Sequence, residues 1–134
     1  MYSILQLNAM MQHYVGNKKG KVVKFSYEKG VIELVIKDGK RIFKERLHGK
    51  SFVDILNKFS PSGYKRFRDG RQFAQHYENL LKLYFMQKQY NVNFDDYQTK
   101  YVESDSVLLN NTKKPDLLIM NKDDYKIYKK IYKK

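Results

Sequence analysis

The fold is decided by residues 21–47, which read KVVKFSYEKGVIELVIKDGKRIFKERL. This stretch holds three strand-like runs, at residues 22–27, 31–36 and 41–47. The middle run is apolar on both faces, so we expect it to be the central strand of the sheet. Asp38 and Gly39 form a strong hairpin signal between the last two runs, because both residues tolerate a positive φ. The stretch therefore predicts a three-stranded antiparallel meander.

Amphipathic helices are expected before and after this meander. Ser3 and Gln6 form a capping-box pair at the start of a helix over residues 3–14. Ser51 is the expected N-cap of a short second helix, which ends at the breaker Ser60-Pro61. We expect the buried side of this second helix to consist of Phe52, Val53, Ile55, Leu56 and Phe59.

The longest expected helix covers residues 70–88. Asp69 is its expected N-cap, with Gln72 as the partner three positions on. Its core-facing stripe has the strongest helical periodicity in the chain. The residues of this stripe are Phe73, Tyr77, Leu80, Leu81 and Tyr84.

The last third of the chain is less regular. Residues 91–112 are polar and poorly periodic, with one expected strand near 92–101, and a short buried strand is expected at 117–120. Residues 125–134 are expected to form a helix capped by Asn121, because helical spacing separates their lysines from their Ile and Tyr side chains.

The predicted fold class is therefore α+β. A three-stranded antiparallel meander packs against amphipathic helices, and a short basic helix lies at the C-terminus. No linker, internal repeat or low-complexity segment supports a second domain, so we expect residues 1–134 to form a single basic domain.

The composition describes a basic protein without cysteine. The 134 residues include 27 Lys and Arg against 14 Asp and Glu, a formal charge of +13. Such an excess destabilises the compact state by self-repulsion, so it indicates a polyanionic partner. The lack of cysteine excludes disulfides, thiolate metal sites and a cysteine nucleophile. No apolar run approaches the roughly 20 residues of a membrane span and no signal peptide is evident, so we expect a cytoplasmic protein with no membrane partner.

The kind of positive charge narrows the choice of partner. Lysines outnumber arginines 22 to 5, which favours attraction to a phosphate backbone over reading of guanine edges. Part of the lysine excess fits the mutational bias of an AT-rich genome, and small size with this bias suits a phage or mobile element. The charge predicts binding to DNA or RNA with little sequence specificity.

Segment 64–71 is the most specific candidate site. It places four basic and two aromatic residues in eight positions, just before a helix start whose N–H groups can help to hold a phosphate. An aromatic ring here can stack on an unpaired base. The alternative is a solvated loop whose aromatic rings are buried in the core. The predicted binding residues of this segment are Tyr64, Lys65, Arg66, Phe67, Arg68 and Arg71.

Two further groups of lysines are predicted to contact phosphates. Lys18, Lys19 and Lys21 lie in a turn over residues 16–21, which lacks the spacing and the Ser or Thr of a nucleotide-hydrolysing phosphate loop. The second group lies on the C-terminal helix, which is expected to present Lys126, Lys129, Lys130 and Lys133 on one face. An ordinary solvated surface is the alternative for both groups of lysines. A membrane surface or a partner groove is a further alternative for the C-terminal helix.

Three short pieces of the chain resemble the PD-(D/E)xK nucleases. They are Glu78, Pro115-Asp116 and Asp124-Tyr125-Lys126. The resemblance implies carboxylates that hold Mg²⁺ and a lysine near the attacking water. In that family the last acid and the lysine stand on the strand paired with the Pro-Asp strand, whereas here only seven residues separate Asp116 from Asp124.

An acid–base pair is the other catalytic arrangement that the sequence offers. Glu45 and His48 flank the end of the third expected strand, where metal-independent ribonucleases can carry such a pair beside an arginine such as Arg41 or Arg46. A lone histidine before glycine is more often a turn residue. No spacing of histidines and acids indicates a zinc site.

The combined interpretation is a small nucleic-acid-binding accessory or regulatory protein that contacts the phosphate backbone and is not expected to be an enzyme. We expect no catalytic residue, no metal site and no cofactor. The first alternative is an inhibitor or interaction protein that docks on an acidic protein or a nucleoprotein complex, as a counter-defence factor would. The second is a Mg²⁺-dependent nuclease of degenerate PD-(D/E)xK type. The sequence leaves open DNA or RNA, single or double strand, and the oligomeric state.

Overall fold

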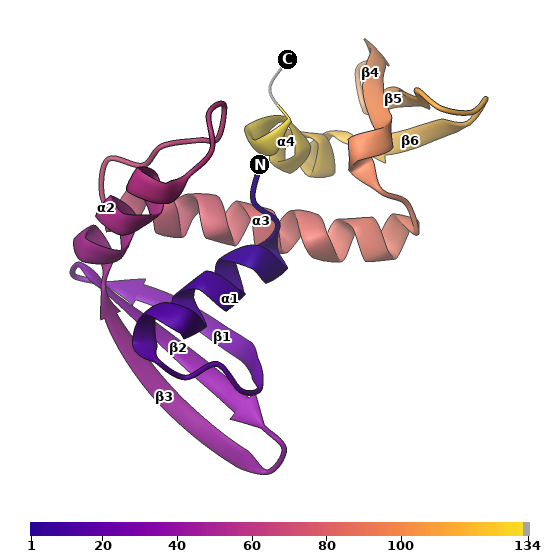
Figure 1. The fold of residues 1–134 in the computed structure, drawn as a ribbon. Helices are drawn as coiled ribbons and strands as arrows, with labels where there is room; N and C mark the ends of the chain where they lie inside the picture. Colours follow the sequence, from indigo (N-terminus) through magenta and orange to yellow (C-terminus); the bar gives the residue numbers. More distant parts are fainter. Residues whose placement is uncertain (133–134) are drawn as a thin grey trace. The chain divides into compact units, whose positions relative to one another are not determined.

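Residues 1–132, which this computed structural model describes, form four α-helices and two three-stranded antiparallel sheets (Figure 1). They divide into two compact units, Met1–Glu78 and Asn79–Lys134, with the boundary inside the longest helix. The α+β class, the meander and the C-terminal helix are confirmed. The single domain over residues 1–134 stays a prediction.

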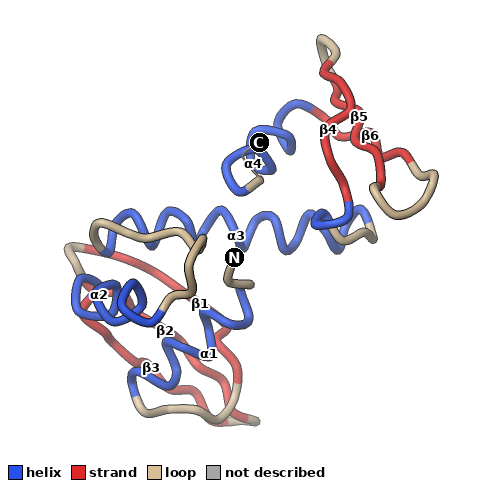
Figure 2. Tube along the Cα trace, turned by 45° about the horizontal axis from the view of Figure 1, so that its top comes forward, coloured by secondary structure: helices blue, strands red, loops and turns tan. Residues whose placement is uncertain are grey.

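Unit 1 contains the predicted meander. Its strands pair in the order β1-β2-β3, so β2 is central, as predicted. Figure 2 shows the three strands side by side, with α1 and α2 running beside them. The elements of this unit are α1 (Ile4–Val15), β1 (Lys21–Glu28), β2 (Val31–Asp38), β3 (Arg41–His48), α2 (Gly49–Phe59) and the first part of α3 (Gly70–Tyr90).

Only one face of the first sheet is covered. Ile32, Leu34 and Ile36 of β2 are fully buried on that face. Successive strand residues point to opposite faces, and Val31 on the other face is 37% exposed. Within unit 1, therefore, the buried face of the sheet is the one that carries Ile32, Leu34 and Ile36. We call the opposite face the outer face of the sheet.

Aromatic packing fixes α3 on the covered face. Phe73 is fully buried, and its ring centroid lies 5.3 Å from that of Phe52 in α2. Tyr77 stacks on Phe25 of β1 with a centroid separation of 3.9 Å. Burial raises the pKa of the Tyr77 phenol to about 12. The predicted stripe is confirmed at Phe73, Tyr77 and Leu80, whereas Leu81 and Tyr84 are only partly buried.

Helix α1 begins as predicted, and α2 does not. The capping box of Ser3 and Gln6 is complete, with hydrogen bonds of 2.8 and 3.1 Å. The N-cap of α2 is His48, whose Nδ1 accepts the Ser51 N–H at 3.3 Å, so the prediction of Ser51 as the cap is wrong. An imidazole nitrogen here takes the place of the usual Ser or Asp oxygen.

The predicted buried side of α2 is too wide. Phe52, Val53 and Leu56 are buried, but Ile55 is 45% and Phe59 is 70% exposed. An 11-residue helix against a single core buries one stripe, and the next apolar positions around the helix face solvent.

Unit 2 holds a second sheet, in which the strand expected at 117–120 is confirmed as β6 and the strand expected near 92–101 overlaps β4. Its strands pair in the order β4-β5-β6, and β5 was not predicted. The elements are the rest of α3, a 3₁₀ turn (Phe94–Asp96), β4 (Tyr97–Val102), β5 (Ser106–Asn111), β6 (Leu117–Asn121) and α4 (Lys122–Ile131).

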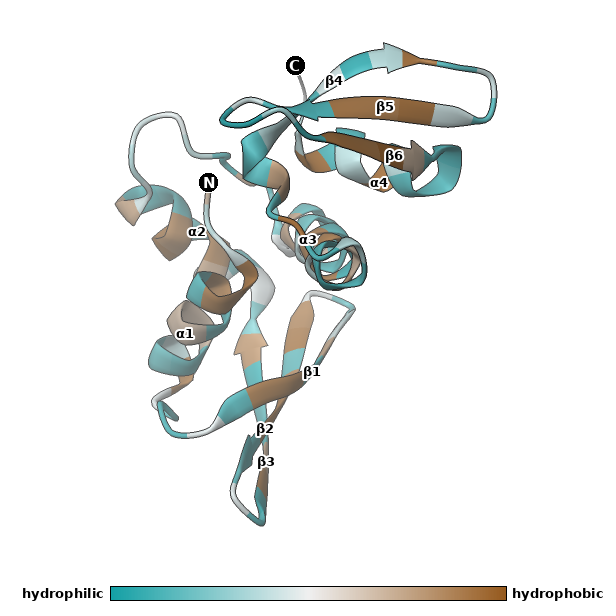
Figure 3. Cartoon of the chain, turned by 90° about the vertical axis from the view of Figure 1, so that its right-hand side faces the viewer, coloured by the Kyte–Doolittle hydropathy of each residue, from teal (hydrophilic) through white to brown (hydrophobic). Residues whose placement is uncertain are grey.

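Helix α4 closes the core of unit 2. Asn121 caps it by accepting the Asp124 N–H at 2.8 Å, as predicted. Tyr128 is 3% exposed, and its ring meets Phe94 edge-on at 5.6 Å. Figure 3 shows the apolar residues of the sheet concentrated in β5 and β6. The buried cluster consists of Leu83, Met86, Phe94, Tyr97, Val107, Leu109, Met120 and Tyr128.

None of the helices in residues 1–132 combines the length and the apolar character that a bilayer crossing needs.

Candidate nucleic-acid interface

The α1–β1 loop presents the first group of predicted lysines. The buried Gln12 side chain holds this loop, because its Nε2 lies 3.3–3.4 Å from the carbonyl oxygens of Asn17, Lys19 and Gly20. Lys18, Lys19 and Lys21 are all exposed. A rigid backbone therefore carries three cations whose side chains are free to move in solvent.

Gly20 brings this loop against the β2–β3 turn. It has a φ of +82°, and a Cβ at this position would lie 2.4 Å from the Lys37 carbonyl oxygen. Glycine is required here both by the backbone conformation and by this contact. Figure 1 shows the α1–β1 loop and the β2–β3 turn at the same end of the first sheet.

The two turns and the adjoining strands form one basic surface, which we call the basic sheet end. Its eight cations are exposed and are accompanied by two acids, Asp38 next to the turn and Glu45 beside Asn17 on the covered face, so its formal balance is +6. None of the eight takes part in an ion pair with another described residue. The cations are Lys18, Lys19, Lys21, Lys24, Lys37, Lys40, Arg41 and Lys44.

A β-bulge aligns these lysines. The register is regular from Lys24 onward and shifts between Val22 and Lys24, so that Val23 is an extra residue. Strict alternation would place Lys21 and Lys24 on opposite faces, because they are three positions apart. The extra residue restores the phase, and both lysines lie on the outer face opposite Lys37 and Val35.

Replacing Gly20 by alanine is expected to destabilise the protein by about 2–3 kcal/mol, because the new Cβ adds a collision to the cost of a positive φ. Gly39 is the matched control, since its φ is +63° and nothing lies within 4 Å of its added Cβ. Gly39→Ala should therefore cost only about 1–2 kcal/mol. Urea unfolding of both variants measures the difference. Equal losses would contradict the close approach of the loop to Lys37.

Segment 64–71 lies at the other end of the first sheet. Gly70 packs on Gly49, where a Cβ on Gly49 would lie 3.1 Å from the Gly70 Cα, and the Gly49 N–H donates to Gly30 in the β1–β2 turn at 2.8 Å. Each strand has eight residues, a length of about 26 Å. The structure therefore separates the two predicted phosphate-binding segments of unit 1.

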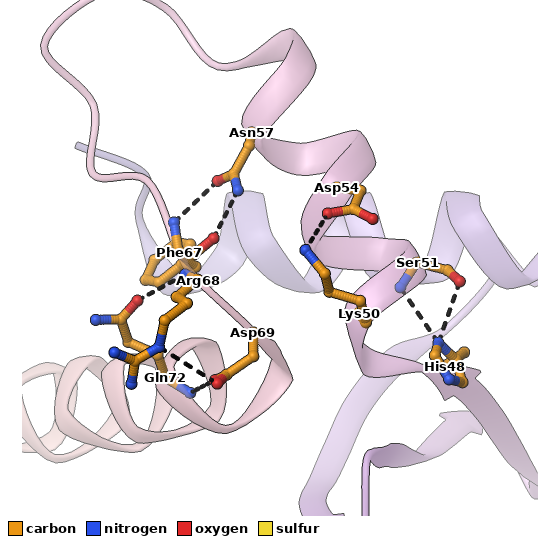
Figure 4. A network of polar contacts seen from close by, with 9 residues as sticks. All are labelled: His48, Lys50, Ser51, Asp54, Asn57, Phe67, Arg68, Asp69 and Gln72. Atoms are coloured by element: carbon orange, nitrogen blue, oxygen red, sulfur yellow. Dashed lines mark hydrogen bonds and ion pairs between the residues drawn. The ribbon is translucent and has the colours of Figure 1, made fainter.

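Phe67 is not available for base stacking in this structure. Its side chain is 5% exposed and packs edge-on against Phe73 at 5.3 Å. The Asn57 amide clamps its backbone, accepting the Phe67 N–H at 3.0 Å and donating to the Phe67 carbonyl at 2.7 Å (Figure 4). The Phe67 ring therefore occupies the core, as the alternative for this loop states, and its contact with a base stays a prediction. Tyr64 is half-buried and edge-on to Tyr2 at 4.7 Å.

The four cations of segment 64–71 are exposed, but they differ in whether an acid lies nearby. Asp69 caps α3 as predicted, accepting the Gln72 N–H at 2.9 Å, while the Gln72 side chain accepts the Arg68 N–H at 2.7 Å. The hydrogen bond from Gln72 and the nearby Arg68 lower the pKa of Asp69. Arg68 lies 3.6 Å from the Asp69 carboxylate, as Figure 4 shows, so part of its charge is balanced. Lys65, Arg66 and Arg71 have no such partner among the described residues.

Helix α4 presents lysines as predicted, within unit 2. Lys126, Lys129 and Lys130 are exposed, whereas Tyr128 is buried, and Lys129 Nζ lies 5.6 Å from the Tyr125 ring centroid. Lys133 lies outside the described residues.

The nuclease pattern is not assembled. Asp124 is in the first turn of α4, where it accepts a hydrogen bond from Tyr90 at 2.7 Å, and Lys126 is also helical. The strand paired with β6 is β5, which contains no acid or lysine. Among the described residues, no three His, Cys, Asp or Glu side chains are grouped so that they could hold a metal ion.

Glu45 and His48 do not form a pair either. Glu45 faces the covered side of the sheet, opposite Leu34, and accepts from the Asn17 amide at 3.4 Å. His48 pairs with Val31 on the outer face and caps α2. Arg46 is bound to Glu33 at 3.1 Å. Each of these groups therefore makes a structural contact of its own.

Five cations of the basic sheet end were absent from the predicted site. Strand pairing brings them into this surface. Lys24 and Lys44, for example, both pair with Val35 on the outer face. The β2–β3 turn consists of Gly39 and Lys40, one position later than the predicted Asp38-Gly39 turn, because Asp38 is still paired with Arg41. The predicted hairpin nevertheless places Lys37, Lys40, Arg41 and Lys44 close to one turn, so these four cations were accessible from the sequence. Lys24 was not, because the bulge leaves no clear trace in the sequence.

Comparisons of the chain with protein-family models, with curated proteins and with solved structures give no match.

Proposed function

We propose that the protein binds nucleic acid through the phosphate backbone, with the basic sheet end as its main contact surface. It acts as a non-enzymatic accessory or regulatory protein. Lysine ammonium groups on flexible stems neutralise phosphates without reading bases, so the binding has little sequence preference.

One observation carries this proposal. Lys21 and Lys37 are direct cross-strand partners on the outer face, and both are exposed. Like charges directly opposite each other on a sheet destabilise it, and neither lysine is paired with an acid in the described residues. A bound polyanion removes this repulsion, so the arrangement favours an anionic partner over free solvent.

The acidic side of the outer face limits the contact area. Glu33 and Glu28 lie further along the same face, towards the β1–β2 turn, and Glu33 is paired with Arg46. Phosphates are repelled there. The proposed contact area therefore ends between the Lys24–Val35–Lys44 row and the Glu33–Arg46 pair.

Replacing Lys24, Lys37 and Lys44 together by glutamine is expected to weaken binding on the order of a hundredfold at about 0.15 M salt. Each lost phosphate contact should reduce the log K versus log salt slope by roughly 0.7–0.9, about fivefold in affinity at that salt concentration. Fluorescence anisotropy with random-sequence DNA and RNA, each single-stranded and duplex, measures both quantities. The wild type should bind with micromolar affinity.

Arg46→Gln is the matched control. Arg46 lies on the same strand and the same face as Lys44, two residues away, but its charge is already balanced by Glu33. Its replacement should leave the salt slope within about 0.3 of the wild-type value, because little counterion is released there. Absence of nucleic-acid binding by the wild type would favour docking on an acidic protein surface instead. Equal losses in the triple variant and the control would place the contact elsewhere.

A further inference from the structure

The basic sheet end offers cations without aromatic rings. The aromatic residues of the first sheet all face the covered side, since Phe25, Tyr27 and Phe43 pair with the buried Leu34, Ile32 and Ile36. The apolar side chains that do reach solvent among the lysines are aliphatic. Val23 is 58% and Ile42 is 67% exposed.

This composition differs from that of a surface for unpaired bases. Proteins that bind single strands combine cations with exposed aromatic rings, and each stacked base contributes about 1–3 kcal/mol. Of the two rings in segment 64–71, Phe67 is buried and Tyr64 is packed on Tyr2. In unit 1, therefore, neither the basic sheet end nor that segment provides a free ring beside its cations.

The cations also form a two-dimensional array. Lys24 and Lys44 flank Val35 on neighbouring strands, so their Cα atoms are two strand spacings apart, about 10 Å. Lys21 and Lys37 form a second row on the same face. A single strand presents one line of phosphates, whereas a duplex presents two lines, separated by grooves about 6 and 12 Å wide in B-DNA. Flexible lysine side chains can reach both lines at once.

We infer that the ligand of the basic sheet end is a nucleic-acid duplex, held by the phosphates of both strands, and not a single strand. This inference rests on the proposed function and specifies its substrate class. The exposed Val23 and Ile42 contact sugar edges and need no unstacked base. The shared chemistry of the ligand is a double line of phosphates, which B-form DNA and A-form RNA both supply.

The test compares ligands of equal length and sequence by fluorescence anisotropy at about 0.15 M salt. The arms are an unstructured 20-nucleotide DNA strand, its DNA duplex and the RNA duplex of the same sequence, with the wild type and the Lys24, Lys37 and Lys44 to glutamine variant. The duplexes should bind at least about tenfold more tightly per phosphate than the single strand, because their charge density is higher. The basic sheet end has no exposed aromatic ring on which the bases of a single strand could stack to make up this difference in affinity. The triple variant should lose this preference. The two duplex arms report whether DNA or RNA is preferred.

The results distinguish nucleic-acid binding as such from the preference for a duplex. Binding of the single strand as tightly as either duplex would overturn the inference and leave the proposed function in place. A duplex preference that survives in the triple variant would also overturn it, because the preference would then arise elsewhere. Binding to none of the three ligands would refute the proposed function itself. Circular dichroism of the triple variant should match the wild type, since all three lysines are exposed.

Discussion

Replacing Phe73 by alanine is expected to lower the free energy of unfolding by about 3–5 kcal/mol, the usual cost of emptying a buried phenylalanine site. Phe73 is fully buried and contacts the rings of Phe25, Phe52 and Phe67 at centroid distances of 5.3–6.4 Å. Three elements and the 64–71 segment meet on this ring. Because these neighbours are held by backbone hydrogen bonds, the cavity cannot close fully.

Phe59→Ala is the control for this prediction. Phe59 belongs to the same unit, but it is 70% exposed at the end of α2. Its replacement should change the free energy of unfolding by no more than about 0.5 kcal/mol. Urea unfolding followed by circular dichroism gives both values. A loss at Phe73 no larger than that at Phe59 would contradict the aromatic core of unit 1.

The meander and its helices could be predicted because their local signals agree. Asp38-Gly39 indicates a hairpin because Gly39 accepts the positive φ that the turn requires. The Ser3–Gln6 pair indicates a helix start because each side chain accepts a hydrogen bond from the backbone N–H of the other residue. The sheet of unit 2 lacks such signals. Its strands are five or six residues long, and β4 is exposed along nearly its whole length, so that no alternation of buried and exposed residues marks it.

Tertiary contacts decide which side chains of the predicted site remain accessible. Phe67 stands in a run of basic residues that is typical of a solvated loop, but the Asn57 amide and the Phe73 ring draw it into the core. His76 in α3 lies beside Phe67, and burial and, secondly, the nearby Lys65 lower its pKa to about 4. In the basic sheet end, by contrast, the fold gathers exposed cations. Lys18, Lys19 and Lys21 already stand together in the sequence, and strand pairing brings the other five cations close to them.

Ending the chain after Asp124 is expected to unfold unit 2 while unit 1 keeps its structure. The truncation removes Tyr128, which is 3% exposed, packs on Phe94 and donates to the Tyr97 carbonyl at 3.3 Å. Loss of this side chain alone costs about 3–5 kcal/mol, a large part of the 5–15 kcal/mol that stabilises a typical domain. It also exposes the fully buried Leu109 and Met120. Amide hydrogen exchange should therefore become fast in β5 and β6 and stay slow in β2.

Replacing the exposed lysines of α4 is the control, because this change removes the charge of the helix and leaves its packing on unit 2 intact. Changing Lys126, Lys129 and Lys130 to glutamine leaves the apolar side in place, and exposed substitutions usually change stability by no more than about 0.5 kcal/mol each. Hydrogen exchange in unit 2 should then match the wild type, although the contact of Lys129 with the Tyr125 ring is lost. If these lysines contact phosphates, affinity alone should fall. Slow exchange in β5 and β6 after truncation would mean that the second sheet is stable without α4, and the role assigned to Tyr128 would be wrong.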